Sequence, residues 1–242
     1  MIKLLKDACV IARIKAYQVQ RSLTANFVFI VIMPVAMLFF ASNLEPEGGN
    51  LGPRLIAGSM VFSLGISTVN EVAQNMVFER FNHQLQLLVV APVHRLSYAA
   101  GTLGFGALRG AIGALSVVLA APLFGYSLEL SFWLLPLALL TALSMAGISL
   151  VIGTWSPDQP TGNLLAQVAG ILVVMVSPIY FELSRLPGWL QLPAQLSPYT
   201  HAAQAFQGSF SGSTELAEIG VLIAITIATM TLGVMGMRWR DI

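Results

Sequence analysis

The side chains that could carry out catalysis are few in this chain, and they are not grouped. The three histidines, His83, His94 and His201, are scattered, and none stands at metal-ligand spacing from another. Cys9 is the only cysteine, so neither an intrachain disulfide nor a cysteine metal cluster can form. No glycine is followed by Lys and then Ser or Thr, so the phosphate-binding loop of P-loop nucleotidases is absent. The sequence predicts a protein that is not an enzyme, without a metal site.

Glu71 and Arg109 are charged residues within segments that are otherwise apolar and long enough to cross a membrane. A charge at membrane depth is costly, so it marks a functional site by default. At ~1.5 Å per helical residue, Glu71 lies roughly 10 Å inward of Glu79. By the same measure Arg109 lies roughly 20 Å inward of Arg95. Two interpretations stay open: a structural salt bridge between neighbouring spans, or a polar lining of a substrate path.

Six long apolar segments organise the chain. Of its 242 residues 56% are apolar and 10% are charged, whereas a soluble domain carries about 25% charged residues. Each segment has room for the roughly 20 residues that a spanning helix needs. The segments cover residues 22–44, 55–78, 96–128, 130–155, 161–181 and 219–237. We expect an all-α integral membrane protein with six transmembrane helices in a single domain, residues 1–242.

The basic residues predict how this domain is oriented. Six crossings place both termini on one side of the membrane. Nine of the twelve Lys and Arg fall on that side: Lys3, Lys6, Arg13, Lys15, Arg21, Arg80, Arg95, Arg238 and Arg240. The opposite side would hold only Arg54 and Arg185. By the positive-inside rule both termini are therefore cytoplasmic. The net charge of +1 gives no reason to expect a nucleic-acid partner.

Two segments outside the spans are predicted to lie at the membrane surface. Residues 1–21 place apolar side chains on one helical face and mostly charged side chains on the other, which is typical of an interfacial amphipathic helix. That helix is either a basic anchor or a mechanical part of the protein. Residues 182–213 are apolar but are divided by Pro187, Pro193 and Pro198. We expect them to form short re-entrant or interfacial helices before the last span.

The cytoplasmic loop of residues 79–97 combines charged residues with an apolar run. Leu85 and Leu88, at i and i+3, could form an exposed apolar ridge, and Pro92 should end the helix that carries it. An apolar ridge facing the cytoplasm indicates a docking surface for a partner. The alternative is a surface helix that lies on the lipid head groups.

The same loop carries the closest match to a known family. It has an acidic-basic pair, two leucines and a Pro-x-x-Arg element: Glu79, Arg80, Leu85, Leu88, Pro92 and Arg95. A second segment, residues 196–203, reads Leu-Ser-Pro-Tyr-Thr-His-Ala-Ala. With the order of the elements, these features resemble the ABC-2 type permease family, the membrane subunits of ABC exporters, over essentially the whole chain. The family's Gly-Thr-Leu-Glu element is replaced around residues 82–86, and Gln207 stands where the family often has Arg.

The resemblance implies that residues 79–97 form a coupling loop that docks into a separate ATPase subunit, with those six loop residues carrying the contact. It also implies that residues 1–21 form a connecting helix. ATP and Mg would bind in the partner ATPase, with no cofactor in this chain. A second permease chain, identical or a close homologue, would complete the path. The implied function is export of an amphiphilic or hydrophobic substrate, drug or lipid-like, across a prokaryotic plasma (inner) membrane.

Two other functions remain open at the level of the sequence. One is an ion-coupled secondary transporter that uses Glu71, although the two similar halves common in such proteins are not evident. The other is a non-transporting membrane scaffold for envelope or cofactor assembly.

Overall fold

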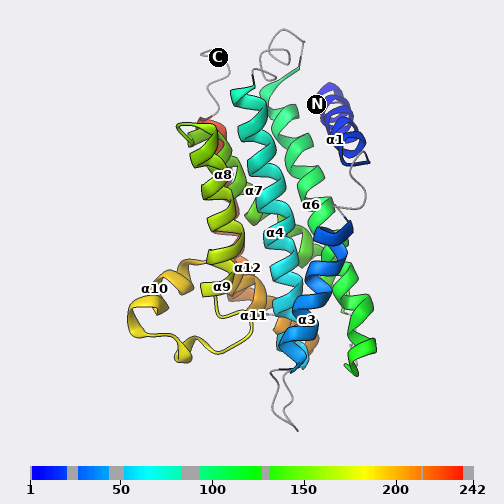
Figure 1. The fold of residues 1–242 in the computed structure, drawn as a ribbon, viewed down its shortest axis with the longest axis vertical. Coiled ribbons are helices and arrows are strands. Elements are labelled where there is room, and N and C mark those ends of the chain that lie inside the picture. Colours follow the sequence, from blue (N-terminus) through cyan, green and yellow to red (C-terminus); the bar gives the residue numbers. More distant parts are fainter. Residues whose placement is uncertain are drawn as a thin grey trace.

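The computed structural model describes residues 2–20, 27–43, 52–82, 93–126, 131–213 and 215–236, and the regular structure in these ranges is entirely helical. Three predicted loop residues, Leu85, Leu88 and Pro92, lie outside the described residues. Successive long helices run in opposite directions through one bundle (Figure 1). The prediction of an all-α protein is confirmed.

Five helical stretches in the described part of the chain are long and apolar enough to cross a membrane. They are α4 (Gly52–Phe81), α6 (Arg95–Ala120) with the 3-10 turn η2 (Ala121–Phe124), α7 (Leu134–Trp155), α8 (Gln159–Gln167) continued by η3 (Val168–Leu172) and α9 (Val173–Val176), and α12 (Leu216–Gly236). The first expected span, residues 22–44, appears as η1 (Val28–Ile32) and α3 (Met33–Asn43), which together are shorter. Both ends of that span lie outside the described residues, so the count of six stays a prediction.

Helix α4 is the central element of the bundle. In its most apolar stretch 89% of the residues are buried inside the protein, against 11% for α12. Burial of this extent marks an interior helix, and α4 packs against α3, α6, α7, α8 and α11. Figure 1 shows α4 between α3, α6, α7 and α8. Any displacement of α4 therefore acts on most of the other helices.

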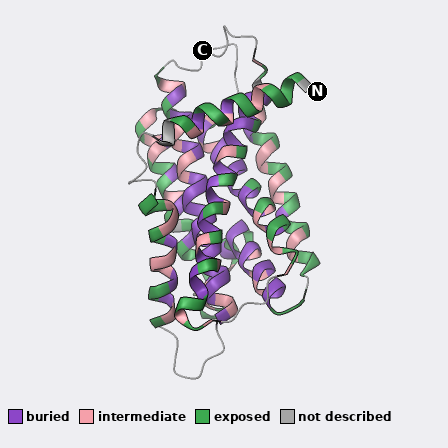
Figure 2. Cartoon of the chain, turned by 90° about the vertical axis from the view of Figure 1, so that its right-hand side faces the viewer, coloured by how far each residue is buried: buried purple, intermediate pink, exposed green. Residues whose placement is uncertain are grey.

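Helix α1 (Ile2–Gln20) lies across one end of the bundle, which we call the α1 end (Figure 2). It packs against α6. Its buried side chains include Ile11 and Lys15, one turn apart, while Leu5, Val10 and Tyr17 are exposed apolar residues. One face of α1 thus contacts protein and another offers apolar surface to lipid, as a helix in the membrane interface requires.

The segment before the last span contains three short helices, η4 (Leu183–Arg185), α10 (Gly188–Leu196) and α11 (Pro198–Phe210). Helix α11 is mostly buried and packs against α4, α7 and α12 at the end of the bundle opposite α1, here called the α11 end (Figure 1). The predicted division of this segment by prolines is observed at Pro198, which begins α11, while Pro193 lies inside α10. The prediction that these helices are re-entrant or interfacial stays a prediction.

Glycines on α6 allow close approach of its neighbours. A Cβ atom on Gly106 would lie 2.3 Å from Val72 of α4, and one on Gly110 would lie 2.5 Å from Thr68. Small residues four apart commonly mark such contacts between membrane helices. Farther along α6, a Cβ atom on Gly101 would lie 2.6 Å from the backbone carbonyl oxygen of Ala8 in α1. Gly101 therefore sets how closely α1 rests on the bundle.

Replacing Gly101 by alanine should displace α1, because the clash is with a backbone atom that cannot rotate away. We expect a loss of about 1–3 kcal/mol of stability, the usual cost of overpacking. The measurement is thermal unfolding of the purified protein, with protease access to α1 as a local readout. Gly104→Ala is the matched control, because no atom lies within 4 Å of its added methyl group. Equal behaviour of the two variants would contradict the prediction.

Candidate functional site

A buried cluster of Lys15, Glu79 and Tyr98, the end cluster, joins three helices at the α1 end. The Lys15 ammonium of α1 forms an ion pair with Oε1 of Glu79, which is in the last turns of α4. The Tyr98 hydroxyl of α6 donates a hydrogen bond of 2.5 Å to Oε2 of the same carboxylate. Both carboxylate oxygens of Glu79 therefore bind groups from other helices.

Burial makes this cluster sensitive to the loss of any one member. Lys15 is 4% exposed and Glu79 is 8% exposed. Burying two charges costs free energy of desolvation. That cost is offset only when the charges pair with each other and their other polar atoms also form hydrogen bonds. The Lys15 ammonium also lies 5.8 Å from the centre of the Tyr98 ring, a cation–π distance. The end cluster fixes α1 against α4 and α6.

Arg80 ties the same end of α4 to α7. Its Nη1 donates to the carbonyl oxygens of Thr154, at 2.9 Å, and Ser156, at 2.8 Å. These carbonyls lie at the carboxyl end of α7, where backbone acceptors lack helical partners and the helix dipole favours a cation. Consecutive residues on a helix point about 100° apart, so Glu79 and Arg80 hold different neighbours.

The coupling loop of residues 79–97 joins α4 to α6 at this end. Among its predicted contact residues, Glu79 and Arg80 make contacts within the chain, and Arg95 begins α6. His94 caps α6, because its Nδ1 accepts a 3.2 Å hydrogen bond from the Leu96 backbone N–H. Both ends of the loop are thus fixed to the bundle. The docking role predicted for its residues stays a prediction.

Sequence reasoning missed Lys15 and Tyr98 as members of this site. Lys15 carried a signal in retrospect, since it stands one turn after the apolar Ile11 and shares its buried face. Tyr98 gave none, because an aromatic residue near the end of a span is typical of any membrane helix.

The two charges predicted at membrane depth lie in contact. Arg109 of α6 forms an ion pair through Nη1 with Oε2 of Glu71 in α4. The Asn75 amide donates to Oε1 of Glu71 at 2.7 Å. Arg109 is buried and Glu71 is partly buried. The pair also borders a cavity, so the geometry contains a structural contact and a polar lining in one place.

The α11 end is fastened by polar contacts of its own. His201 of α11 binds the Glu218 carboxylate of α12 through Nδ1, and its Nε2 lies 2.6 Å from the carbonyl oxygen of Gln195 in α10. The Tyr199 hydroxyl donates to the carbonyl oxygen of Ala169 in η3 at 3.1 Å. Helix α11 is therefore joined to α10 and to the two spans that contain η3 and α12.

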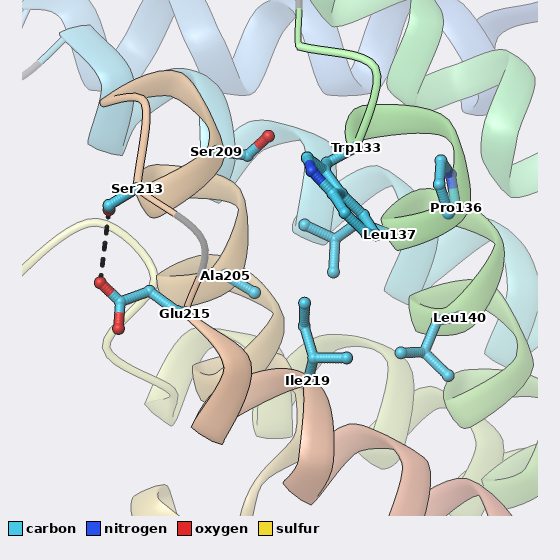
Figure 3. A pocket seen from close by; sticks show the side chains of 9 residues that line it. All are labelled: Trp133, Pro136, Leu137, Leu140, Ala205, Ser209, Ser213, Glu215 and Ile219. Atoms are coloured by element: carbon cyan, nitrogen blue, oxygen red, sulfur yellow. Dashed lines mark hydrogen bonds between the residues drawn. The ribbon is translucent and has the colours of Figure 1, made fainter.

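A small pocket of about 70 Å³ lies beside these contacts, between α7, α11 and α12. Figure 3 shows Trp133 and Leu137 on one side of it and Ala205 and Ile219 on the other, with Glu215 at the edge. Binding sites for drug-sized molecules occupy about 300–1,000 Å³. This pocket is too small for one and is interpreted as imperfect packing.

Long antiparallel apolar helices, with their few charges paired inside the bundle, define a multi-pass membrane protein. The family model described as ABC-2 type transporter matches residues 8–211. The chain belongs to the ABC-2 type transporter family and is the membrane subunit of an ABC transporter. Membership implies an ABC ATPase as partner subunit, since this family is a membrane transport domain that generally lacks its own nucleotide site. No curated protein matches the chain in sequence.

Breaking the Lys15–Glu79 pair from one side should cost more than removing both charges. Lys15→Met or Glu79→Gln alone leaves a buried charge without its partner, a loss of up to about 3–5 kcal/mol. The double variant should be closer to the native protein in stability than either single variant. Unfolding titrations of the four proteins measure the coupling energy.

The control for this cycle is Lys6→Met, which removes a lysine from an exposed position of the same helix. It should leave stability unchanged within about 0.5 kcal/mol. Strictly additive effects of Lys15→Met and Glu79→Gln would contradict the assignment of the pair.

Proposed function

We propose that the chain is the membrane-spanning subunit of an ATP-driven exporter whose ATPase docks on residues 79–97. The substrate is an amphiphilic or hydrophobic molecule, drug or lipid-like, that leaves the cytoplasm or the inner leaflet. The observation that carries this proposal is the end cluster together with Arg80. It fastens the base of the coupling loop to α1, α6 and α7 at once.

The mechanism follows from that attachment. The loop connects the end of α4, the central helix, to the start of α6. Closure of the ATPase on ATP, with Mg, would push the loop, and the push would reach α4 and α6 along their axes. Helices are stiff along their axes, because each turn is held by backbone hydrogen bonds. Helix α1 would move with them, because Lys15 binds Glu79.

The remaining parts of the proposal concern assembly and orientation. Two permease chains, identical or closely homologous, would pair and enclose the path between them. Both termini would lie in the cytoplasm of a prokaryotic cell, with the protein in its plasma membrane. Lys3, Lys6 and Arg13 lie at exposed positions at the α1 end. By the positive-inside rule they support a cytoplasmic location of that end.

The contacts of Glu71 favour this function over ion-coupled transport. A carboxylate that binds a transported ion or proton must be free to exchange partners. Both oxygens of Glu71 already bind groups of this chain, Arg109 and Asn75. A scaffold without transport activity is the remaining competitor, and ATP-dependent substrate movement in proteoliposomes separates it from an exporter.

Leu88→Ala and Arg80→Glu should uncouple ATP hydrolysis from transport. The permease is reconstituted with its ATPase in liposomes that contain a fluorescent short-chain lipid with an uncharged glucosyl head group, and lipid moved per ATP hydrolysed is measured. We expect this ratio to fall by about tenfold. A tenfold change corresponds to about 1.4 kcal/mol, which lies within the range of coupling energies that single residues carry. Leu88→Ala also leaves the bonds from Arg80 to α7 in place, so its effect does not come from the loss of those bonds.

The matched control is Arg185→Glu, the same charge reversal at an exposed position of the α11 end. Normal insertion and normal transport are expected for it. Normal transport by both loop variants would refute the proposed docking surface.

A further inference from the structure

A cavity of about 190 Å³ lies beside α4 at membrane depth, between α4, α6 and η1. Its lining residues are Phe29, Ile66, Ser67, Asn70, Glu71, Gln74, Asn75 and Arg109. Six of these eight are polar, in a bundle whose spans are otherwise apolar. Polar groups within a membrane are costly and mark functional sites. The cavity, here called the polar cavity, has room for several water molecules and hence for a small head group.

Helix α4 supplies most of the polar cavity from one face. Ser67, Asn70, Glu71, Gln74 and Asn75 stand at i, i+3, i+4, i+7 and i+8. Residues at these spacings share one side of a helix. Four of these five residues are only partly buried on a helix that is otherwise mostly buried, so the stripe is the side of α4 that the cavity leaves accessible.

The charges of the polar cavity compensate each other. Glu71 binds Arg109 through one oxygen and accepts a hydrogen bond from Asn75 through the other. The lining therefore presents one positive and one negative charge in contact, with no net charge. Neither a cationic nor an anionic ligand would find an uncompensated counter-charge there.

Two uncharged polar atoms of the lining, in contrast, have no hydrogen-bond partner among the described residues. They are Oγ of Ser67 and Oδ1 of Asn70, and both are buried. Gln74 makes no side-chain hydrogen bond to the described part of the chain. Buried polar atoms without partners are uncommon in folded proteins, and atoms of this kind that line a cavity can be satisfied by a bound molecule or water. Hydroxyl groups suit these atoms, because a hydroxyl both donates and accepts.

Two π-helical turns flank the polar cavity. The turn η1 contains Phe29, which lines it, and η3 contains Gly170. A Cβ atom on Gly170 would lie 3.0 Å from Oδ1 of Asn70, so η3 rests on the Asn70 amide. Single π-helical turns are uncommon and occur frequently at functional sites. One turn lines this cavity and the other contacts a residue that lines it, which is a second indication of a binding site.

We propose that the polar cavity binds the uncharged, hydroxyl-bearing head group of an amphiphile. Ser67, Asn70 and Gln74 would bind its hydroxyls, and Phe29 and Ile66 would contact the first carbons of its apolar chain. This inference rests on the proposed function, since it names the class of molecule that the exporter takes up. Its test needs neither the ATPase nor transport, so the head-group site and the exporter function can be refuted separately.

The experiment compares three photoreactive probes that share one diazirine-bearing dodecyl chain. Their head groups are glucosyl, trimethylammonium and phosphate. The full-length protein in lipid nanodiscs is labelled over a range of probe concentrations, and mass spectrometry measures labelling of α4. We expect saturable labelling by the glucosyl probe alone. Asn70→Leu and Gln74→Leu should each weaken its apparent affinity by about threefold to tenfold, the effect of a lost hydrogen bond.

The matched control is Gln167→Leu, the same substitution at an exposed position of α8 outside the polar cavity. It should label as the native protein does. Preference for the trimethylammonium or phosphate probe would overturn the proposal, as would equal labelling by all three. Unchanged labelling in both Asn70→Leu and Gln74→Leu would also overturn it. Retained labelling without ATP-driven lipid movement would refute the exporter function and leave the site in place.

Discussion

Charge compensation away from water is the constraint on which the rest of this structure depends. Helix α4 carries two carboxylates into surroundings that would not tolerate them alone, Glu71 at membrane depth and Glu79 near its end. Each binds a cation from another helix through one oxygen and accepts a hydrogen bond through the other. Removing a cation would leave a buried negative charge. These requirements fix which helices contact α4 and at what height.

The two carboxylates also place two functions on one helix. Eight residues separate them, which is about 12 Å along the axis. The end cluster lies where the coupling loop begins, and the polar cavity lies around Glu71. The interior helix of the bundle thus runs from the surface proposed for the ATPase to the site proposed for the substrate, with no flexible segment between them in α4. A displacement at one site necessarily displaces a wall of the other.

The sequence predicted the helices, and it predicted that Glu71 and Arg109 lie on neighbouring spans, because long apolar segments and isolated charges are strong signals. It did not predict that Arg80 binds the end of α7, because backbone carbonyl acceptors leave no mark in a sequence. The stripe of Ser67, Asn70 and Gln74 is visible at helical spacing, yet polar residues on a span also occur at contacts between membrane helices and do not by themselves indicate a cavity. The π-helical turns η1 and η3 depend on tertiary packing, which residue patterns do not express.

The distribution of these contacts indicates which helices move together. Helices α4 and α6 are joined at two heights, by Glu79 with Tyr98 and by Glu71 with Arg109, so neither can slide along the other without breaking a buried polar contact. Arg80 adds α7 to this unit, and hydrogen bonds from α7 to α12 add the last span. No hydrogen bond or ion pair joins α4 to α8, η3 or α9 among the described residues. Apolar contacts resist sliding less than buried ion pairs do. The fifth span therefore lacks a polar link to α4 within the described residues and can shift past it, and because η3 rests on Asn70, that shift would change the polar cavity.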